Sequence, residues 1–169
     1  MKVHIEPWRE GQSSIYAIVR EGVCLIDRFF DELEEYREKH AIDLASFITM
    51  ITREPHIRPG FLRPELPNHG VYAMYSEKET RIPYNPSRLL CGYVGTSARI
   101  LLVGAGFVKD YTGSIQDNPL GNGEALFLAE VIKQVNARVD HGEIEIVGSS
   151  LIPRYADSLH FDTRRYDHG

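Results

Sequence analysis

The stretch RLLCGYVGTSARILLVGAGFVK, residues 88–109, decides the fold of this chain. It holds two nearly continuous apolar segments, 88–94 and 99–108, which are joined by the short sequence GTSA. Apolar runs of this length with a brief glycine-containing connection are typical of adjacent antiparallel strands. We therefore predict a β-hairpin here, within the sheet of the protein.

The segments before this hairpin predict a first strand and two helices. Residues 13–20, SSIYAIVR, are rich in β-branched and aromatic side chains, as strands are. Residues 24–40 carry apolar side chains at helical spacing, with acids on the opposite face. Asp43 is a suitable N-cap for a second helix that runs from Leu44 to about Thr52.

The connection between these helices and the hairpin is rich in proline. Residues 53–70 contain four prolines, which preclude a regular helix, so we interpret this segment as an ordered loop that enters the sheet. Residues 71–76 predict one more strand, because their character alternates along the chain. Residues 77–87 then form a polar loop with two further prolines.

The segments after the hairpin complete the predicted architecture. A loop over 110–123 precedes a third helix over 124–139, and residues 143–147 predict a last strand. The fold class is therefore α+β: two N-terminal helices, an antiparallel twisted sheet of about four strands, and a C-terminal helix. We expect one domain over 1–149 and a tail over 150–169 that is loosely packed or ordered only by a partner.

The composition excludes several classes of protein. The chain has 169 residues, of which 43% are hydrophobic, and this length fits one domain with a real core. No apolar run is long enough for a signal sequence or a membrane span, so we expect a soluble, cytoplasmic protein. Neither HExxH nor CxxC occurs, so we expect no metal site and no cofactor. Cys24 and Cys91 are interpreted as buried thiols, with a disulfide or a nucleophile as alternatives.

Charge is distributed unevenly along the chain. The formal net charge is −5, which excludes a general attraction to nucleic acid. Residues 53–109 nevertheless carry eight basic against four acidic side chains, whereas residues 20–43 carry four basic against eight acidic ones. The basic middle segment can form a local anion site, and the alternative is that both segments are simply solvated faces.

Three segments resemble the RelE/ParE-like toxin superfamily, in its phage-derived, HigB-like branch. GVYAMY (70–75) resembles the family strand G-L-Y-E-L-R, and RLLCGYV (88–94) resembles the family strand R-I-L-Y. RILLVGAGFVK (99–109) resembles R-I-V-L-L-H-G-F-x-K, the hallmark of that branch. The resemblance extends over residues 24–136 and implies a RelE-like fold.

The resemblance implies a function. Family members are toxins of type II toxin–antitoxin pairs, and many cleave messenger RNA on the ribosome without a metal. The implied activity is therefore metal-independent endoribonuclease, with mRNA or the ribosome and an antitoxin protein as partners; a homo-oligomer is also compatible. Such cleavage requires a base for the 2′-hydroxyl proton, cations for the scissile phosphate, and an acid for the leaving oxygen.

Five residues are candidates for this catalysis. Arg88 matches the basic residue that opens the third family strand, and Lys109 matches the Lys that ends the fourth. Arg81, in the preceding loop, can reach the same face. Tyr111 and His69 are proton-transfer candidates, chosen for their chemistry and their proximity in sequence.

Two residues are candidates for RNA binding, and each site candidate has a plainer alternative. Arg99 can hold phosphate through its planar charged fork, and Tyr75 can stack on an unpaired base. The alternatives are surface ion pairs for Arg88 and Arg99, a structural loop position for His69, and core packing for Tyr111.

Departures from the family pattern favour a second interpretation. Tyr75 and Ala73 stand where the family strand has Arg and an acid, and Asp110 stands where relatives often have a second Lys. An anion in place of a cation weakens phosphate binding. The alternative function is a non-catalytic protein-interaction module on the same fold, and a third interpretation is an unrelated α+β domain.

Overall fold

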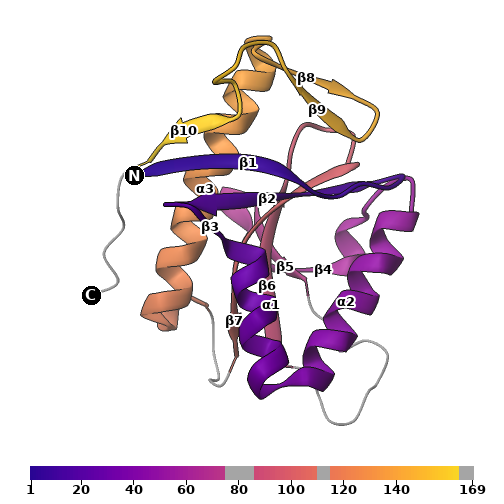
Figure 1. Cartoon of the computed structure of the whole chain (residues 1–169), viewed down its shortest axis with the longest axis vertical. Coiled ribbons are helices and arrows are strands. Elements are labelled where there is room, and N and C mark those ends of the chain that lie inside the picture. The colour runs from indigo at the N-terminus through magenta and orange to yellow at the C-terminus, as the bar shows by residue number, and fades with distance from the viewer. Residues whose placement is uncertain (75–85, 110–114, 164–169) are drawn as a thin grey trace.

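The structure, a computed structural model, describes residues 1–74, 86–109 and 115–163, and consists of a large mixed sheet with helices on both faces (Figure 1). The helices are α1 (Leu25–Tyr36), α2 (Glu38–Arg53) and α3 (Pro119–Asp140), with short 3₁₀ turns at η1 (Pro59–Phe61), η2 (Pro67–His69) and η3 (Ile115–Asp117). The strands are β1 (Lys2–Arg9), β2 (Ser14–Arg20), β3 (Val23–Cys24), β4 (Leu62–Leu66), β5 (Val71–Met74), β6 (Ser87–Tyr93), β7 (Ile100–Val108), β8 (Ile144–Val147), β9 (Ser150–Pro153) and β10 (His160–Asp162).

The main sheet corrects the predicted fold class. Its strand order is β10-β1-β2-β7-β6-β5-β4, with β3 also paired to β2, so it has eight strands where about four were expected. It is also mixed, because β2 runs parallel to β7 with Ala17 opposite Val103. Two parallel neighbouring strands must be joined by a long crossover connection, and the chain between β2 and β7 contains the helices α1 and α2. The α+β class with three helices remains, but the antiparallel four-stranded sheet was wrong.

Three strands that were not predicted, β1, β4 and β10, lie toward the margins of the main sheet, whereas β9 pairs with β8 in a separate two-stranded sheet. Pro64 lies in β4, the strand at one end of the order, where a missing N–H donor is tolerated. Pro7 lies in β1 beyond the part that pairs with β10, which covers only Lys2 to His4. β10 comes from the segment expected to be a loose tail, yet Thr163 N donates to Met1 O at 3.0 Å. The prediction of a loose tail was therefore wrong for residues 150–163.

Two cores form because successive residues of each central strand point to opposite faces of the sheet. Ile18 and Leu90 pack with α3 on one face, whereas Ala17 and Leu89 pack with α1 and α2 on the other. Figure 1 shows the same separation, with α1 and α2 on one side and α3 on the other. The central strands β2, β6 and β7 are buried over most of their length, which explains their continuous apolar sequence.

Two glycines allow the helices to lie close to the sheet. A Cβ at Gly106 would collide with the ring of Phe29 from α1. A Cβ at Gly92 would collide with Ile132 of α3 and lie 2.7 Å from Gly70 O. These glycines belong to the β6–β7 hairpin, so the hairpin that was predicted from sequence sets the spacing of both layers.

The helix boundaries differ from the expected ones for local reasons. The helix predicted over 24–40 is interrupted at Arg37, whose φ of −148° and ψ of 55° are not helical, so α1 ends and α2 begins there. α3 starts five residues earlier than predicted, because Asn118 caps it and Pro119 occupies its first position. The Asn118 Oδ1 accepts a hydrogen bond of 2.9 Å from Gly121 N.

Candidate functional site

Two of the predicted cations lie at the same end of the β6–β7 hairpin. Arg88 is opposite Phe107 in the strand register, one residue from the end of β7. Lys109 directly follows β7, and its backbone N donates to Pro86 O at 2.8 Å. The hairpin therefore places Arg88 and Lys109 at the same end of the sheet.

Arg88 is completely buried, with 0% of its surface exposed. Its Nη1 donates to Ser87 O at 2.9 Å. A guanidinium with no exposed surface cannot contact an RNA phosphate in this conformation. The structure thus places Arg88 as a positioning residue inside the protein, and direct phosphate binding does not describe it.

Glu65 of β4 is the carboxyl group around which these cations act. Only 8% of its side chain is exposed, and burial raises its pKa. The positive charges of Arg63, Lys109 and Arg88 act in the opposite direction and favour the ionised carboxylate. Arg63 Nε lies 4.0 Å from Glu65 Oε1. We call Arg63, Glu65, Arg88 and Lys109 the β4 carboxyl cluster.

This cluster contains the elements of proton-transfer chemistry. A buried carboxyl group with a raised pKa can exchange a proton nearer neutral pH than an ordinary Glu. Arg63 keeps 37% of its side chain exposed and Lys109 is half-buried, so both can face an anion. Sequence analysis counted Glu65 only in the charge balance, because it lies in a proline-rich segment with no recognisable spacing. No signal in the sequence alone singles it out.

The other described candidates lie at the opposite end of the hairpin. Arg99 directly precedes β7, and its guanidinium donates to Gln12 O at 3.0 and 3.3 Å. His69 is exposed and lies just before β5. The nearby β5 residue Tyr72 is opposite Cys91, which lies toward the end of β6 that is away from Arg88. Arg99 and His69 are therefore not brought together with Lys109. Three further candidates lie outside the described residues: Tyr75, Arg81 and Tyr111.

A second buried pair fixes the start of α3 on the sheet. Arg20 Nη1 and Nη2 each donate to one oxygen of the Glu124 carboxylate at 3.0 Å, and the two side chains are 16% and 11% exposed. The same guanidinium lies 4.7 Å from the ring centre of Phe127. A bidentate pair with a ring beneath it orients both partners. The pair joins β2 to the first turns of α3.

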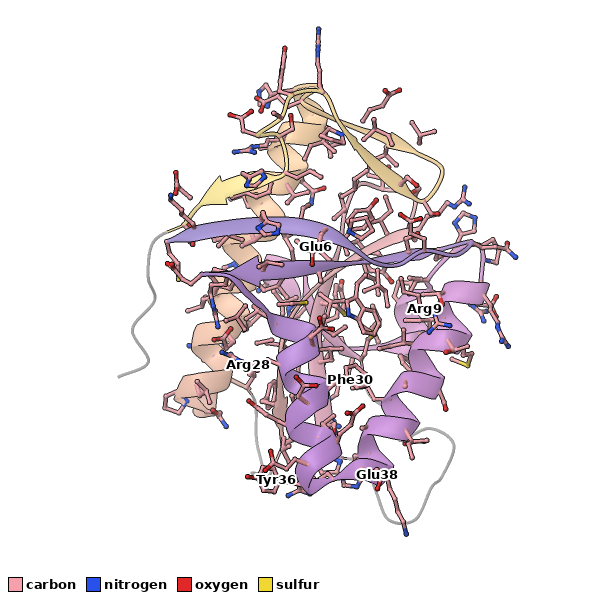
Figure 2. All side chains as sticks on the ribbon, viewed as in Figure 1. Glu6, Arg9, Arg28, Phe30, Tyr36 and Glu38 are labelled. Carbon is pink, nitrogen blue, oxygen red and sulfur yellow. The ribbon has the colours of Figure 1, made fainter. Side chains whose placement is uncertain are left out.

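A groove with a different character lies between β1, α1 and α2. It consists of two adjoining hollows of about 440 and 250 Å³, which share Phe30, Glu34 and Ala45. Trp8 stacks on Phe30 with ring centres 5.9 Å apart, and Trp8 Nε1 donates to Asp27 Oδ1 at 2.8 Å. Figure 2 shows Phe30 between the two helices, with Glu38 at the turn that joins them. We call this hollow the α1–α2 groove.

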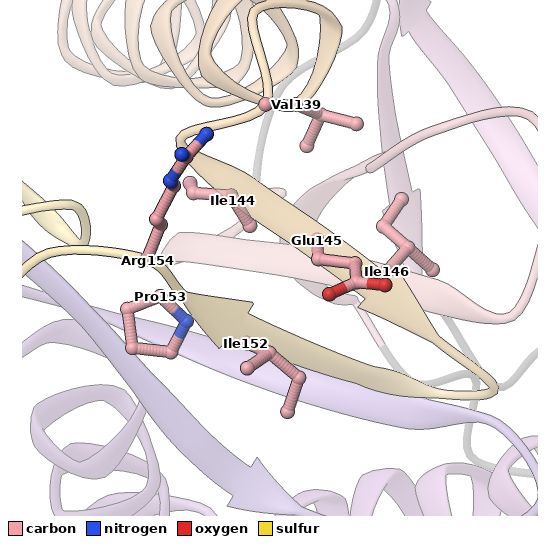
Figure 3. Close-up of a pocket in the computed structure, with 8 residues that line it drawn as sticks. Val139, Ile144, Glu145, Ile146, Ile152, Pro153 and Arg154 are labelled. Carbon is pink, nitrogen blue, oxygen red and sulfur yellow. The ribbon is translucent and has the colours of Figure 1, made fainter.

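A third hollow of about 510 Å³ lies beside the β8–β9 hairpin (Figure 3). Its lining is mostly apolar and includes Val139, Ile144 and Ile152, with Glu145 and Arg154 as the charged members. This lining offers no nucleophile. We therefore assign it no chemistry.

Further side-chain chemistry is limited in the part of the chain that the structure covers. Residues 1–74, 86–109 and 115–163 contain no group of three His, Cys, Asp or Glu side chains arranged to hold a metal. Cys24 and Cys91 form no disulfide, and burial raises the pKa of both thiols, which disfavours the nucleophilic thiolate. None of the helices in these ranges is long and apolar enough to span a membrane.

Comparisons with known proteins provide no relative for this chain. No family model, no curated protein and no solved structure matches it. The candidate sites therefore stand on the geometry given above.

Proposed function

We propose that this chain is an RNA-directed toxin of the RelE/ParE-like kind, with the β4 carboxyl cluster as its reactive end. One observation carries the proposal: Glu65 is a buried carboxyl with Arg63 Nε 4.0 Å from its Oε1, and the charges of Arg88 and of Lys109, which ends the most family-like segment, also favour its ionised form. Cations around a proton-transfer group are what cleavage of an RNA backbone requires.

In the proposed reaction, the Glu65 carboxylate takes the proton of a ribose 2′-hydroxyl. The 2′-oxygen forms a bond to the adjacent phosphorus, and the bond from phosphorus to the 5′-oxygen of the next nucleotide breaks. Lys109 and Arg63 hold the non-bridging phosphate oxygens, on which negative charge increases in the transition state. A water molecule or Tyr111 returns a proton to the leaving oxygen. Arg88, being buried, keeps the cluster in place and does not contact the RNA.

The test is RNA cleavage in a translation extract, followed by mapping of the 5′ ends. Glu65→Gln and Lys109→Ala should each reduce cleavage by about 100-fold or more, the usual loss when a proton-transfer group or its electrostatic support is removed. Lys133→Ala is the matched control, because Lys133 is exposed on α3 and should leave cleavage unchanged. Cleavage that survives both cluster substitutions contradicts the proposal.

A second function, the non-catalytic interaction module, is favoured by the complete burial of Arg88 and by the acidic walls and apolar floor of the α1–α2 groove. The same extract separates the two functions. RNA that stays intact with folded wild-type protein, together with recovery of a stable complex with a partner protein, supports the interaction module and contradicts the nuclease.

A further inference from the structure

We propose that the α1–α2 groove binds a basic, amphipathic helix of a partner protein. This inference goes beyond the proposed function and does not depend on any action on RNA, since the groove is built from other elements than the β4 carboxyl cluster. It rests on the shape of the groove, its apolar floor, and the charge along its walls.

The floor of the groove is apolar and partly open to solvent. Trp8 and Phe30 form a stacked pair that is half-exposed, and Ala45 of α2 is exposed beside them. Ile42 lines the same groove near the helix turn and is 61% exposed. An amphipathic helix can lay its apolar face into a hydrophobic groove of this kind.

The walls of the groove are acidic. Asp27, Asp31 and Glu34 line it from α1, and Glu38 lines it from the start of α2. Arg9 is the basic member of this lining. The excess of negative charge lies directly above apolar side chains, so a ligand must bring both positive charge and apolar surface.

Three of these carboxylates form no ion pair within the described ranges. Among the residues that the structure describes, no basic side chain lies within 4.0 Å of the carboxylates of Asp31, Glu34 or Glu38. Asp27 and Asp31 are also four residues apart on one helix, a spacing at which like charges destabilise the helix slightly. Apart from Asp27, which accepts the hydrogen bond from Trp8, the carboxylates of the groove are available to a ligand.

Charge and length define the occupant. A second copy of this chain, with its net charge of −5, and an RNA both bring more negative charge, whereas Lys and Arg side chains complement the walls. α1 has 12 residues and is therefore about 18 Å long. A helix of three to four turns with a Leu-rich stripe and Lys or Arg on both flanks fits this length and chemistry.

Trp8 makes the test specific to the groove, because it is the single tryptophan of the chain. The probe is a 15-residue helical peptide without Trp that carries a Leu stripe flanked by Lys and Arg, titrated into the full-length protein. We expect the Trp8 emission to shift to shorter wavelength as the peptide covers it, and we expect the affinity to fall as salt is added. A peptide with every Lys and Arg replaced by Glu should not shift it.

Two pairs of substitutions separate the groove from general charge. Asp31→Asn with Glu34→Gln should weaken peptide binding at least tenfold. Glu32→Gln with Glu35→Gln changes the net charge equally on the same helix but outside the groove lining, and should change binding less than threefold. Ala45→Phe keeps the charge, fills the groove, and should also weaken binding at least tenfold. Circular dichroism checks that each variant is folded.

Each other outcome overturns the proposal. Equal binding of the basic and acidic peptides shows an apolar site without charge selection. Equal loss in the two acidic pairs shows attraction to the whole molecule. Absence of binding to the folded protein shows that the groove is not a docking site, and concentration-dependent dimers that shift Trp8 emission show that a second copy occupies it.

Discussion

The β4 carboxyl cluster and the α1–α2 groove both collect charge, but they use it in opposite ways. In the cluster, one buried carboxyl faces three cations, and Arg88 has no exposed surface at all. In the groove, four carboxylates stand at an open apolar hollow with one Arg among them. Charge that is buried must be compensated for the fold to be stable, whereas exposed charge can stay uncompensated and await a partner.

The net charge of −5 does not show that the charges of the cluster and those of the groove have separate roles. Substitution in the cluster should change the free energy of unfolding strongly, since each buried charge depends on its neighbours. Substitution in the groove should change binding and leave the fold nearly unaffected. The predictions below test this contrast, beginning with the largest expected effect.

The largest effect is expected for Arg88→Met. This change removes a completely buried cation whose charge acts on Glu65, so the free energy of unfolding should fall by roughly 3 kcal/mol. Urea denaturation followed by circular dichroism measures it. Lys133→Met on the exposed face of α3 is the control and should change stability by less than about 0.5 kcal/mol. A loss below about 1 kcal/mol for Arg88→Met would mean that the buried charge is not coupled to the fold.

A smaller effect is expected at the Arg20–Glu124 pair, which is buried less completely. Arg20→Ala removes two charge-assisted hydrogen bonds and a cation over Phe127, and should reduce the free energy of unfolding by about 2 kcal/mol. A double-mutant cycle with Glu124→Ala isolates the coupling between the two side chains. Increased hydrogen exchange confined to the start of α3 should accompany the loss. If the two single changes simply add, the pair does not anchor α3.

The sequence predicted those elements whose burial can be recognised from their own apolar pattern. The β6–β7 hairpin and β2 have continuous apolar sequences because both of their faces are covered. The apolar stripe of α3 likewise indicated a helix packed on the sheet. The segment 143–147 was expected to be a strand and forms β8. In these places each residue's surroundings follow from its neighbours in the chain.

The remaining strands could not be predicted, because distant partners create them. β10 is a strand only because β1, more than 150 residues earlier, pairs with it through His4 and His160. β4 contains Pro64 and lies at the edge, so its sequence has the composition of a loop. Glu65 was overlooked for the same reason, since its burial and its three cations come from β4, β6 and the end of β7. Of the predicted site, Lys109 and Arg88 were brought together, whereas Arg99 and His69 were not.

Glu65→Gln should change how stability depends on pH. The folded-state pKa of Glu65 lies above its ordinary value of 4.5, so the folded protein holds a proton that the unfolded chain has already released. Stability from this group is therefore complete at low pH and is lost as the pH rises from 4.5 through the raised pKa. The Gln variant lacks this loss, so its melting temperature should exceed the wild-type value at pH 7 and approach it near pH 4. A difference that grows toward pH 4 would show that the cations, and not burial, dominate at this carboxyl.

The smallest effect on stability is expected in the groove, and its sign is opposite to that of Arg88→Met. Asp31→Asn with Glu34→Gln removes like-charge repulsion along α1, including that between Asp27 and Asp31, and should raise the free energy of unfolding by about 0.5 kcal/mol. Urea denaturation at low ionic strength measures the change, and added salt should reduce it by screening. The same pair of substitutions is expected to abolish most of the peptide binding. A variant that is more stable yet binds the peptide less tightly would show that the acidic residues of the groove serve recognition. A clear loss of stability would mean that these carboxylates stabilise the helix pair, and the contrast between the two regions would not hold.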